Sequence, residues 1–154
     1  MLTELRDRRV TVMGLGRFGG GAGVTRWLCA QGARVLLTDA ADAPTLAEPL
    51  ADIDDLVRAG QVELQLGRHE RRAFVETDLV IANPAVPRPW SNEWLMAATA
   101  AKVPITTEIR LLVERLDRRR VIGVTGSAGK STTSAMVHHV LRAAGLDTRL
   151  GGNI

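Results

Sequence analysis

Two glycine-rich segments hold the residues of this sequence that are best suited to bind phosphate. The second of them, Val124-Thr-Gly-Ser-Ala-Gly-Lys-Ser-Thr132, ends in the Gly-Lys-Ser triplet that is typical of a P-loop. In such a loop the backbone N–H groups surround the phosphates, the lysine reaches the β and γ oxygens, and the serine hydroxyl ligates Mg²⁺. Lys130 and Ser131 have the spacing for these two roles, although Val124 stands where the strict pattern has glycine. The segment therefore predicts a nucleoside-triphosphate site.

The first glycine segment, Gly14-Leu-Gly-Arg-Phe-Gly19, lies between an apolar run and a helical pattern. Glycines in that context let the backbone approach a diphosphate at a helix N-terminus. Asp39 ends the next apolar run, where a carboxylate can accept a hydrogen bond from a ribose hydroxyl. A purely structural glycine turn is the alternative, because this motif alone is weakly specific. We favour a phosphate-binding turn.

The other chemically reactive side chains are less informative. His69, His138 and His139 lack metal-ligand spacing or a nucleophile partner, so we expect surface or core histidines. Trp94 falls on the face of a predicted helix, which favours packing. Cys29 is the single cysteine, so it forms no internal disulfide, and we expect it to be buried in the first helix.

The composition indicates an ordinary globular protein. The chain has 154 residues, of which 45% are hydrophobic and 24% charged, enough for one domain or slightly more. No apolar run approaches the roughly 20 residues that span a bilayer, and no signal peptide is evident, so we expect a cytoplasmic protein without a membrane partner. The net charge is +3, but the basic residues are scattered and aromatics make up only 3%, which argues against nucleic-acid binding.

Short apolar runs and helical patterns alternate along the first three quarters of the chain. We expect strands at 10–13, 34–38, 62–66, 78–82 and 103–107, and helices within 24–32, 45–60, 94–101 and 109–116. Thr45 and Glu48 have the spacing of a capping box. The repeated strand–helix order predicts an α/β fold with a doubly wound parallel sheet.

A second unit follows a run of arginines. Residues 118–120 resemble a linker, so we expect one domain over 1–117 and the start of another over 118–154. The second unit is predicted to contain a strand at 121–125, a helix after the glycine loop, and a further strand from 147. So short a unit cannot close a core of its own. We therefore expect this chain to be cut short within its second domain.

Four segments occur in the order found at the start of the Mur ligases, a family that this chain resembles along its whole length. They are Met13-Gly-Leu-Gly16, Leu79-Val-Ile-Ala-Asn-Pro-Ala-Val-Pro87, Thr125-Gly-Ser-Ala-Gly-Lys-Ser-Thr132 and Gly151-Gly-Asn-Ile154. The last is most similar to the members that add D-glutamate to UDP-N-acetylmuramoyl-L-alanine. The resemblance implies a Rossmann-like domain that holds the UDP of that substrate, followed by a central domain that binds ATP and Mg²⁺.

The resemblance also implies roles for individual residues. ATP is held by Gly126, Ser127, Ala128, Gly129, Lys130, Ser131 and Thr132, with Lys130 catalytic and Ser131 a Mg²⁺ ligand. The uridine nucleotide substrate is contacted by Gly16, Arg17, Phe18, Asp39, Asn83 and Asn153. In the implied reaction ATP phosphorylates the L-alanyl carboxylate, and the amine of D-glutamate displaces phosphate from the acyl phosphate.

Some positions depart from the family pattern. Ala128 stands where asparagine is usual, Ala85 where glycine is common, and the first glycine loop is longer than usual. The resemblance places the family's carboxylate ligands for Mg²⁺ and its amino-acid-binding domain beyond Ile154, so we expect this chain to be inactive alone. We also expect the protein to be a monomer. Two other hypotheses are a stand-alone NAD-type Rossmann module and a Mur ligase that adds a different amino acid.

Overall fold

The computed structural model describes residues 4–16 and 20–152. The chain forms two compact units, one that ends at Leu111 and one that begins at Leu112. The division into domains at residue 117 stays a prediction. Within the described residues, no helix is both long enough and apolar enough to cross a bilayer.

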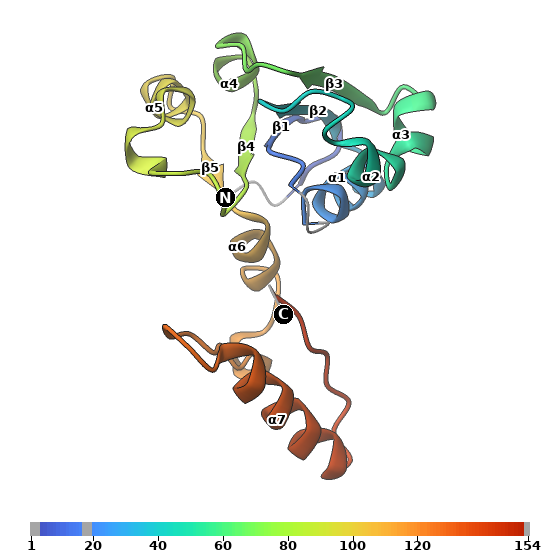
Figure 1. Cartoon of the computed structure of the whole chain (residues 1–154), viewed down its shortest axis with the longest axis vertical. Helices are drawn as coiled ribbons and strands as arrows, with labels where there is room; N and C mark the ends of the chain where they lie inside the picture. The colour runs from blue at the N-terminus through green and yellow to red at the C-terminus, as the bar shows by residue number, and fades with distance from the viewer. Residues whose placement is uncertain (1–3, 17–19, 153–154) are drawn as a thin grey trace. The chain divides into compact units, whose positions relative to one another are not determined.

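A parallel sheet of five strands organises the first unit (Figure 1). The strands are β1 (Arg9–Met13), β2 (Arg34–Asp39), β3 (Val62–Leu66), β4 (Leu79–Ala82) and β5 (Ile105–Thr106). Their order across the sheet is β3-β2-β1-β4-β5, and Val10 in β1 pairs with Val35 on one side and Leu79 on the other. Because successive strands are added first on one side of β1 and then on the other, the predicted doubly wound parallel sheet is confirmed.

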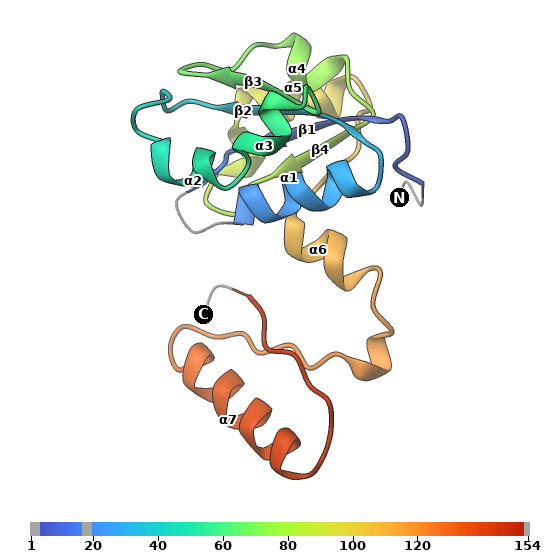
Figure 2. The ribbon, with the colours of Figure 1, turned by 90° about the vertical axis from the view of Figure 1, so that its right-hand side faces the viewer.

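Helices cover both faces of the sheet (Figure 2). One face carries α1 (Gly20–Ala30), α2 (Ala47–Ala51) and α3 (Asp54–Arg58), and the other carries α4 (Arg72–Val75) and α5 (Glu93–Ala100). A 3₁₀ turn, η1 (Pro89–Ser91), precedes α5, and α6 (Glu108–Val113) follows β5. Asn92 caps α5, since its side chain accepts hydrogen bonds from the N–H groups of Trp94 and Leu95.

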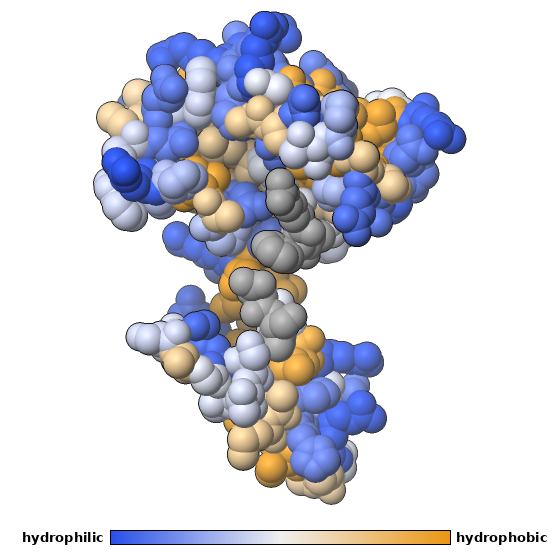
Figure 3. All heavy atoms as spheres, viewed as in Figure 1, coloured by the Kyte–Doolittle hydropathy of each residue, from blue (hydrophilic) through white to orange (hydrophobic). Residues whose placement is uncertain are grey.

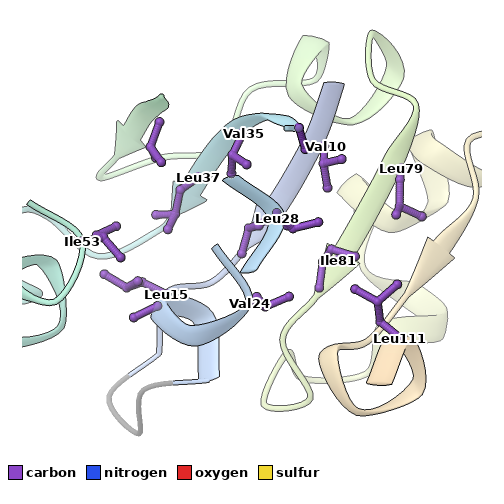
Figure 4. Packing of buried hydrophobic residues seen from close by; sticks show 14 of the residues in the cluster. Val10, Leu15, Val24, Leu28, Val35, Leu37, Ile53, Leu79, Ile81 and Leu111 are labelled. Atoms are coloured by element: carbon purple, nitrogen blue, oxygen red, sulfur yellow. The ribbon is translucent and has the colours of Figure 1, made fainter. Parts of the chain in front are cut away.

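The larger core lies between α1 and the sheet. Val24 and Leu28 of α1 pack against strand residues such as Val10, Val35 and Ile81 (Figure 4). A second cluster on the opposite face centres on Phe74, which is fully buried against α5 residues and Val80. Buried apolar side chains on both faces hold the strands in register, so the carboxyl ends of β1, β2 and β4 meet at one edge.

The helix expected within 45–60 differs from the prediction in two ways. Thr45 and Glu48 form no capping box, because the Asp42 carboxylate accepts hydrogen bonds from both the N–H and the hydroxyl of Thr45. The segment is also two short helices rather than one. Ile53 has φ of −126° between α2 and α3 and is fully buried in the core. The break between α2 and α3 therefore lies at Ile53, the residue that the chain buries in the core.

The second unit contains one long helix, α7 (Lys130–Ala143), preceded by a 3₁₀ turn, η2 (Arg118–Arg120). The strands predicted at 121–125 and 147–150 are absent, so these two expectations are wrong. Val121 does have extended dihedral angles, with φ of −116° and ψ of 125°. An extended segment becomes a strand only when a neighbouring strand accepts and donates its hydrogen bonds, and the described part of this unit offers none.

The apolar side chains of the second unit are largely exposed, in contrast to those of the first. They include Ile122, Met136, Val140, Leu146 and Leu150. Figure 3 shows hydrophobic residues, in orange, exposed among hydrophilic ones on this unit. A hydrogen bond of 2.8 Å between Thr148 Oγ1 and His138 Nδ1 joins the C-terminal segment to α7.

Candidate functional site: a cavity at the sheet edge and the predicted P-loop

A cavity of about 390 Å³ lies at the carboxyl ends of β1, β2 and β4. Its lining residues are Met13, Gly14, Gly16, Asp39, Ala40, His69, Asn83, Ala85, Val86, Pro87, Asn92 and Trp94. The chain leaves β1 toward β2 on one side and reaches β4 on the other, so this is the switch point where open α/β sheets bind ligands. Three predicted site residues, Gly16, Asp39 and Asn83, therefore meet in one cavity.

Asp39 is fixed at the end of β2 by two backbone donors. Its Oδ2 accepts a hydrogen bond from the N–H of Leu15 at 2.9 Å, and its Oδ1 accepts one from the N–H of Ala41 at 2.9 Å. Each carboxylate oxygen keeps a free lone pair. The carboxylate can therefore hold the glycine loop and still accept a hydroxyl from a ligand.

The glycine loop lies against Asn83. Gly14 and Gly16 have φ of 89° and 69°, a backbone conformation that favours glycine. A Cβ atom at Gly14 would lie 3.0 Å from Asn83 Cβ, and one at Gly16 would lie 2.7 Å from Asn83 Nδ2. The backbone of the turn and the adjacent Asn83 side chain thus both favour glycine at these positions. The structural glycine turn that the sequence left as an alternative is therefore present whether or not the loop also binds phosphate.

Asn83 is positioned by its own loop. Its Oδ1 accepts a hydrogen bond from the N–H of Ala85 at 2.8 Å, while Nδ2 points toward the carbonyl of Gly14 at 3.5 Å. The Asn83 N–H also donates to the carbonyl of Met13 at 2.9 Å. These contacts connect the loops after β1 and β4 and leave the Nδ2 group at the cavity wall.

The N-terminus of α1 packs closely beneath the loop. A Cβ atom at Gly21 would overlap the carbonyl of Leu15, and one at Gly20 would lie 2.5 Å from the Glu108 carboxylate. Burial raises the pKa of Glu108 above its usual value. Glycines at these positions allow the helix N-terminus to approach the cavity.

His69 and Trp94 line the same cavity, which the sequence did not predict. His69 Nδ1 lies 2.8 Å from Thr38 Oγ1, and its ring meets Phe74 edge-on with centroids 5.7 Å apart. Burial lowers the pKa of His69, while the negative charge of Asp39 acts in the opposite direction. One sequence signal was available: Thr38 and the Gly67-Arg68-His69 segment fall at the carboxyl ends of adjacent strands.

Cys29, expected to be buried, is only half-buried.

The segment predicted to be a P-loop, residues 124–132, is largely exposed and leads directly into α7. Gly126 and Gly129 have φ of 151° and 75°. Lys130 is the first residue of α7, and its Nζ donates a hydrogen bond of 2.7 Å to the carbonyl of Gly126. Ser131 and Thr132 follow in the first helical turn, whose N–H groups have no acceptor within the helix. This set of donors fits the phosphates of a nucleotide.

Three predicted contacts, Arg17, Phe18 and Asn153, lie outside the described residues.

A second cavity, of about 570 Å³, opens at the amino-terminal ends of the strands beside Arg9 and Arg34. None of the predicted site residues lines it, so it lies apart from the candidate site.

The model of the Mur ligase MurD-like N-terminal domain matches residues 8–107 of the chain. The UDP-N-acetylmuramoylalanine–D-glutamate ligase of Geotalea uraniireducens is 38% identical over 154 residues, covering 98% of this chain and 31% of that protein. The ligase of the same name from Pelotomaculum thermopropionicum is 36% identical, covering all of this chain and 32% of that protein. The chain thus spans about a third of the length of these curated relatives.

Solved structures support the fold. A pseudomurein peptide ligase type C from Methanothermus fervidus has a TM-score of 0.54 at 22% identity, covering 96% of this chain and 29% of that one. SirC, a precorrin-2 dehydrogenase, has a TM-score of 0.51 at 9% identity, covering 96% of this chain and 70% of that one. At these identities the likeness establishes a Rossmann-like fold only. With the family match and the relatives added, the chain belongs to the MurD-like branch of the Mur ligase family.

Proposed function

We propose that this chain is the N-terminal part of an ATP-dependent ligase that adds D-glutamate to UDP-N-acetylmuramoyl-L-alanine in peptidoglycan synthesis. The observation that carries the proposal is the match of the whole chain to ligases of that name at 36–38% identity. The two phosphate-binding candidates lie in the same chain, one in each unit, as a reaction between a nucleotide-linked substrate and ATP requires. As part of the proposal the enzyme is a cytoplasmic monomer without nucleic-acid or membrane partners.

In this proposal the cavity of the first unit holds the uridine nucleotide. The N–H groups at the start of α1 and the glycine loop face the diphosphate, and the helix dipole favours its negative charge. Asp39, which keeps a free lone pair on each oxygen, accepts a ribose hydroxyl. Asn83 Nδ2 is available to donate to the ligand from the opposite wall. Arg17, Phe18 and Asn153 are proposed as further contacts with this substrate.

The P-loop holds the triphosphate of ATP in the same proposal. Backbone N–H groups of residues 126–132 surround the phosphates, Lys130 leaves the Gly126 carbonyl to neutralise the β and γ oxygens, and Ser131 ligates Mg²⁺. When bound, ATP would supply the phosphoryl group, and Mg²⁺ would offset its negative charge.

The proposed reaction has two steps. An oxygen of the L-alanyl carboxylate attacks the γ-phosphorus, the bond to the β-phosphate oxygen breaks, and ADP leaves. The amine of D-glutamate then attacks the acyl phosphate carbon, phosphate leaves with the bonding electron pair, and the amine loses a proton. Lys130 is the residue of this chain proposed to act in the first step, by stabilising charge on the transferred group.

The test is to read the coding frame beyond Ile154 and to assay its whole product. We expect a frame long enough for two further domains, and phosphate release from ATP that requires both UDP-N-acetylmuramoyl-L-alanine and D-glutamate. A frame that stops directly after Ile154 would overturn the enzyme assignment. Activity with a different amino acid would overturn D-glutamate as the substrate. Tight binding of NADH without binding of UDP-sugar nucleotides would favour an NAD-type module instead.

A further inference from the structure

His69 is held in the nucleotide cavity by three neighbours. Its Nδ1 lies 2.8 Å from Thr38 Oγ1. Its ring meets Phe74 at 88° and Trp94 at 63°, with centroids 5.7 and 5.9 Å apart. Phe74 and Trp94 are themselves stacked, at 5.8 Å and 27°. The imidazole therefore has a fixed orientation, and Nε2 is the ring nitrogen left for a ligand.

The hydrogen bond between His69 and Thr38 can form in either neutral tautomer of the imidazole. The Thr38 hydroxyl has one hydrogen and two acceptors in reach, His69 Nδ1 at 2.8 Å and the Arg68 carbonyl oxygen at 3.5 Å. When Nδ1 accepts from the Thr38 hydroxyl, Nε2 carries the hydrogen; when Nδ1 donates, the hydroxyl donates to the Arg68 carbonyl and Nε2 is an acceptor. In the first of these tautomers His69 presents a single donor to the cavity.

The surroundings of His69 suit an uncharged group rather than phosphate. Apart from His69, Asp39 is the only lining residue with an ionisable side chain in the described part of the chain, so the described lining offers no arginine or lysine beside His69. Val86, Pro87 and Trp94 contribute apolar and aromatic surface. Burial also lowers the pKa of His69, which favours the neutral imidazole. A planar, neutral ring with polar edges, such as a nucleobase, matches this part of the cavity.

The order of the groups along the cavity indicates which edge of the base reaches His69. The diphosphate belongs at the glycine loop, and Asp39 is bonded to that loop through Leu15. With the ribose at Asp39, the base extends toward His69 and presents the edge that lies across the ring from the ribose. In uracil this edge carries the C4 carbonyl, an acceptor, whereas in cytosine it carries an amino group, a donor.

We propose that His69 takes the tautomer in which Nδ1 accepts from Thr38, donates a hydrogen bond from Nε2 to the C4 carbonyl of uracil, and so selects uridine over cytidine nucleotides. The inference rests on the proposed function, since it takes a uridine nucleotide as the ligand of this cavity. His69 is a specificity-determining residue in this assignment, and Thr38 is a positioning residue. A cytosine amino group would face the Nε2–H donor and leave both groups without an acceptor.

Calorimetric titration of the 154-residue chain with UDP and with CDP tests the proposal. We expect UDP to bind about tenfold more tightly than CDP, which is the ratio that one discriminating hydrogen bond supports. His69→Leu keeps apolar packing but removes the donor, so it should weaken UDP binding by up to about tenfold, should not weaken CDP binding, and should bring the ratio close to one. His69→Gln retains an amide donor near the Nε2 position and should restore most of the preference.

The role of Thr38 has its own measurement. Nitrogen-15 NMR of the imidazole should show a protonated Nε2 and an unprotonated Nδ1, and Thr38→Val should change that pattern and lower the UDP/CDP ratio. Circular dichroism of each variant checks that it is folded.

Two failures are distinguishable. Equal affinity of the wild-type chain for UDP and CDP, or an unchanged ratio in folded His69→Leu, would overturn the role of His69 and leave the proposed function standing. A wild-type chain that binds neither nucleotide would overturn the assignment of the cavity to a uridine nucleotide, and this inference with it.

Discussion

The backbone N–H of Leu15 donates a hydrogen bond of 2.9 Å to the carboxylate of Asp39 at the carboxyl edge of the sheet. The bond connects the end of β2 to the glycine loop after β1. A group proposed to bind ribose therefore also holds the loop proposed to bind phosphate. Ligand binding and loop geometry at this edge depend on the same side chain.

Asp39→Asn should weaken both stability and nucleotide binding. The amide keeps one acceptor oxygen, so either Leu15 or Ala41 loses its partner and faces an NH₂ group. We expect a loss of about 1–3 kcal/mol in the free energy of unfolding. Urea denaturation measures this loss, and titration with UDP should show weaker binding. Asp54→Asn, which disrupts only an exposed ion pair with Arg58, is the control and should change neither. Unchanged UDP affinity in folded Asp39→Asn would contradict the ribose role.

Two glycine-to-alanine changes should have opposite effects on stability. Gly16→Ala introduces a Cβ at a φ of 69° and 2.7 Å from Asn83 Nδ2, so unfolding should become easier by more than about 1 kcal/mol. Gly23 lies within α1 with open space around it, and Gly23→Ala should stabilise the chain by about 0.5–1 kcal/mol. Urea midpoints of the two variants settle the point. Equal effects would show that Asn83 and the loop adjust freely.

Lys130→Ala should separate the two nucleotide sites. In the product of the whole reading frame we expect a large loss of ATP affinity, because the loop keeps its N–H groups but loses its cation. Binding of the UDP-linked substrate should remain within about twofold, since Lys130 has no part in the cavity of the first unit. Arg142→Ala, in the last turn of α7, is a matched control that should retain ATP. Parallel losses of both ligands in the Lys130 variant would contradict the two-site assignment.

Glu108 should make the stability of the chain depend on pH. Burial raises its pKa in the folded chain above the ordinary value of 4.5, so the folded state holds this proton more tightly than the unfolded state does. The contribution to stability is therefore fully present below pH 4.5 and is lost as the pH rises through the raised pKa. Glu108→Gln cannot lose a proton there. The difference in urea midpoint between Glu108→Gln and the wild type should grow in favour of the variant from pH 4 to pH 7. A difference that does not change with pH would show that deprotonation of Glu108 is not what destabilises the wild type.

Much of the first unit could be predicted from the sequence, because its strands are short apolar runs and its loops are marked by glycine, asparagine and proline. Asp39 was predicted as a site residue from its place at the end of an apolar run, and Asn83 from the resemblance to the family; parallel strands bring the two together at one edge of the sheet. His69 was missed because it lies beyond the end of β3, and its position depends on the return of the chain to Thr38. Periodicity carries no information about that contact.

The second unit was harder to predict for a different reason. The strand expected at 121–125 is wrong although Val121 has extended dihedral angles, because a strand depends on partners elsewhere in the chain. The helix after the P-loop needs only local hydrogen bonds, and α7 is present as expected. The capping box at Thr45 and Glu48 failed locally, since Asp42 competes for the same hydroxyl and N–H.

The contact between Gly16 and Asn83 also constrains how this family can vary. Asn83 Nδ2 occupies the space that a Cβ at position 16 would need, so the side-chain volumes at 16 and 83 are not independent. A residue larger than glycine at 16 calls for a smaller one at 83, such as serine. A smaller residue at 83 would relieve this contact but not the strain that a φ of 69° imposes on a residue other than glycine, so a second-site change at Asn83 should suppress a Gly16 variant only in part.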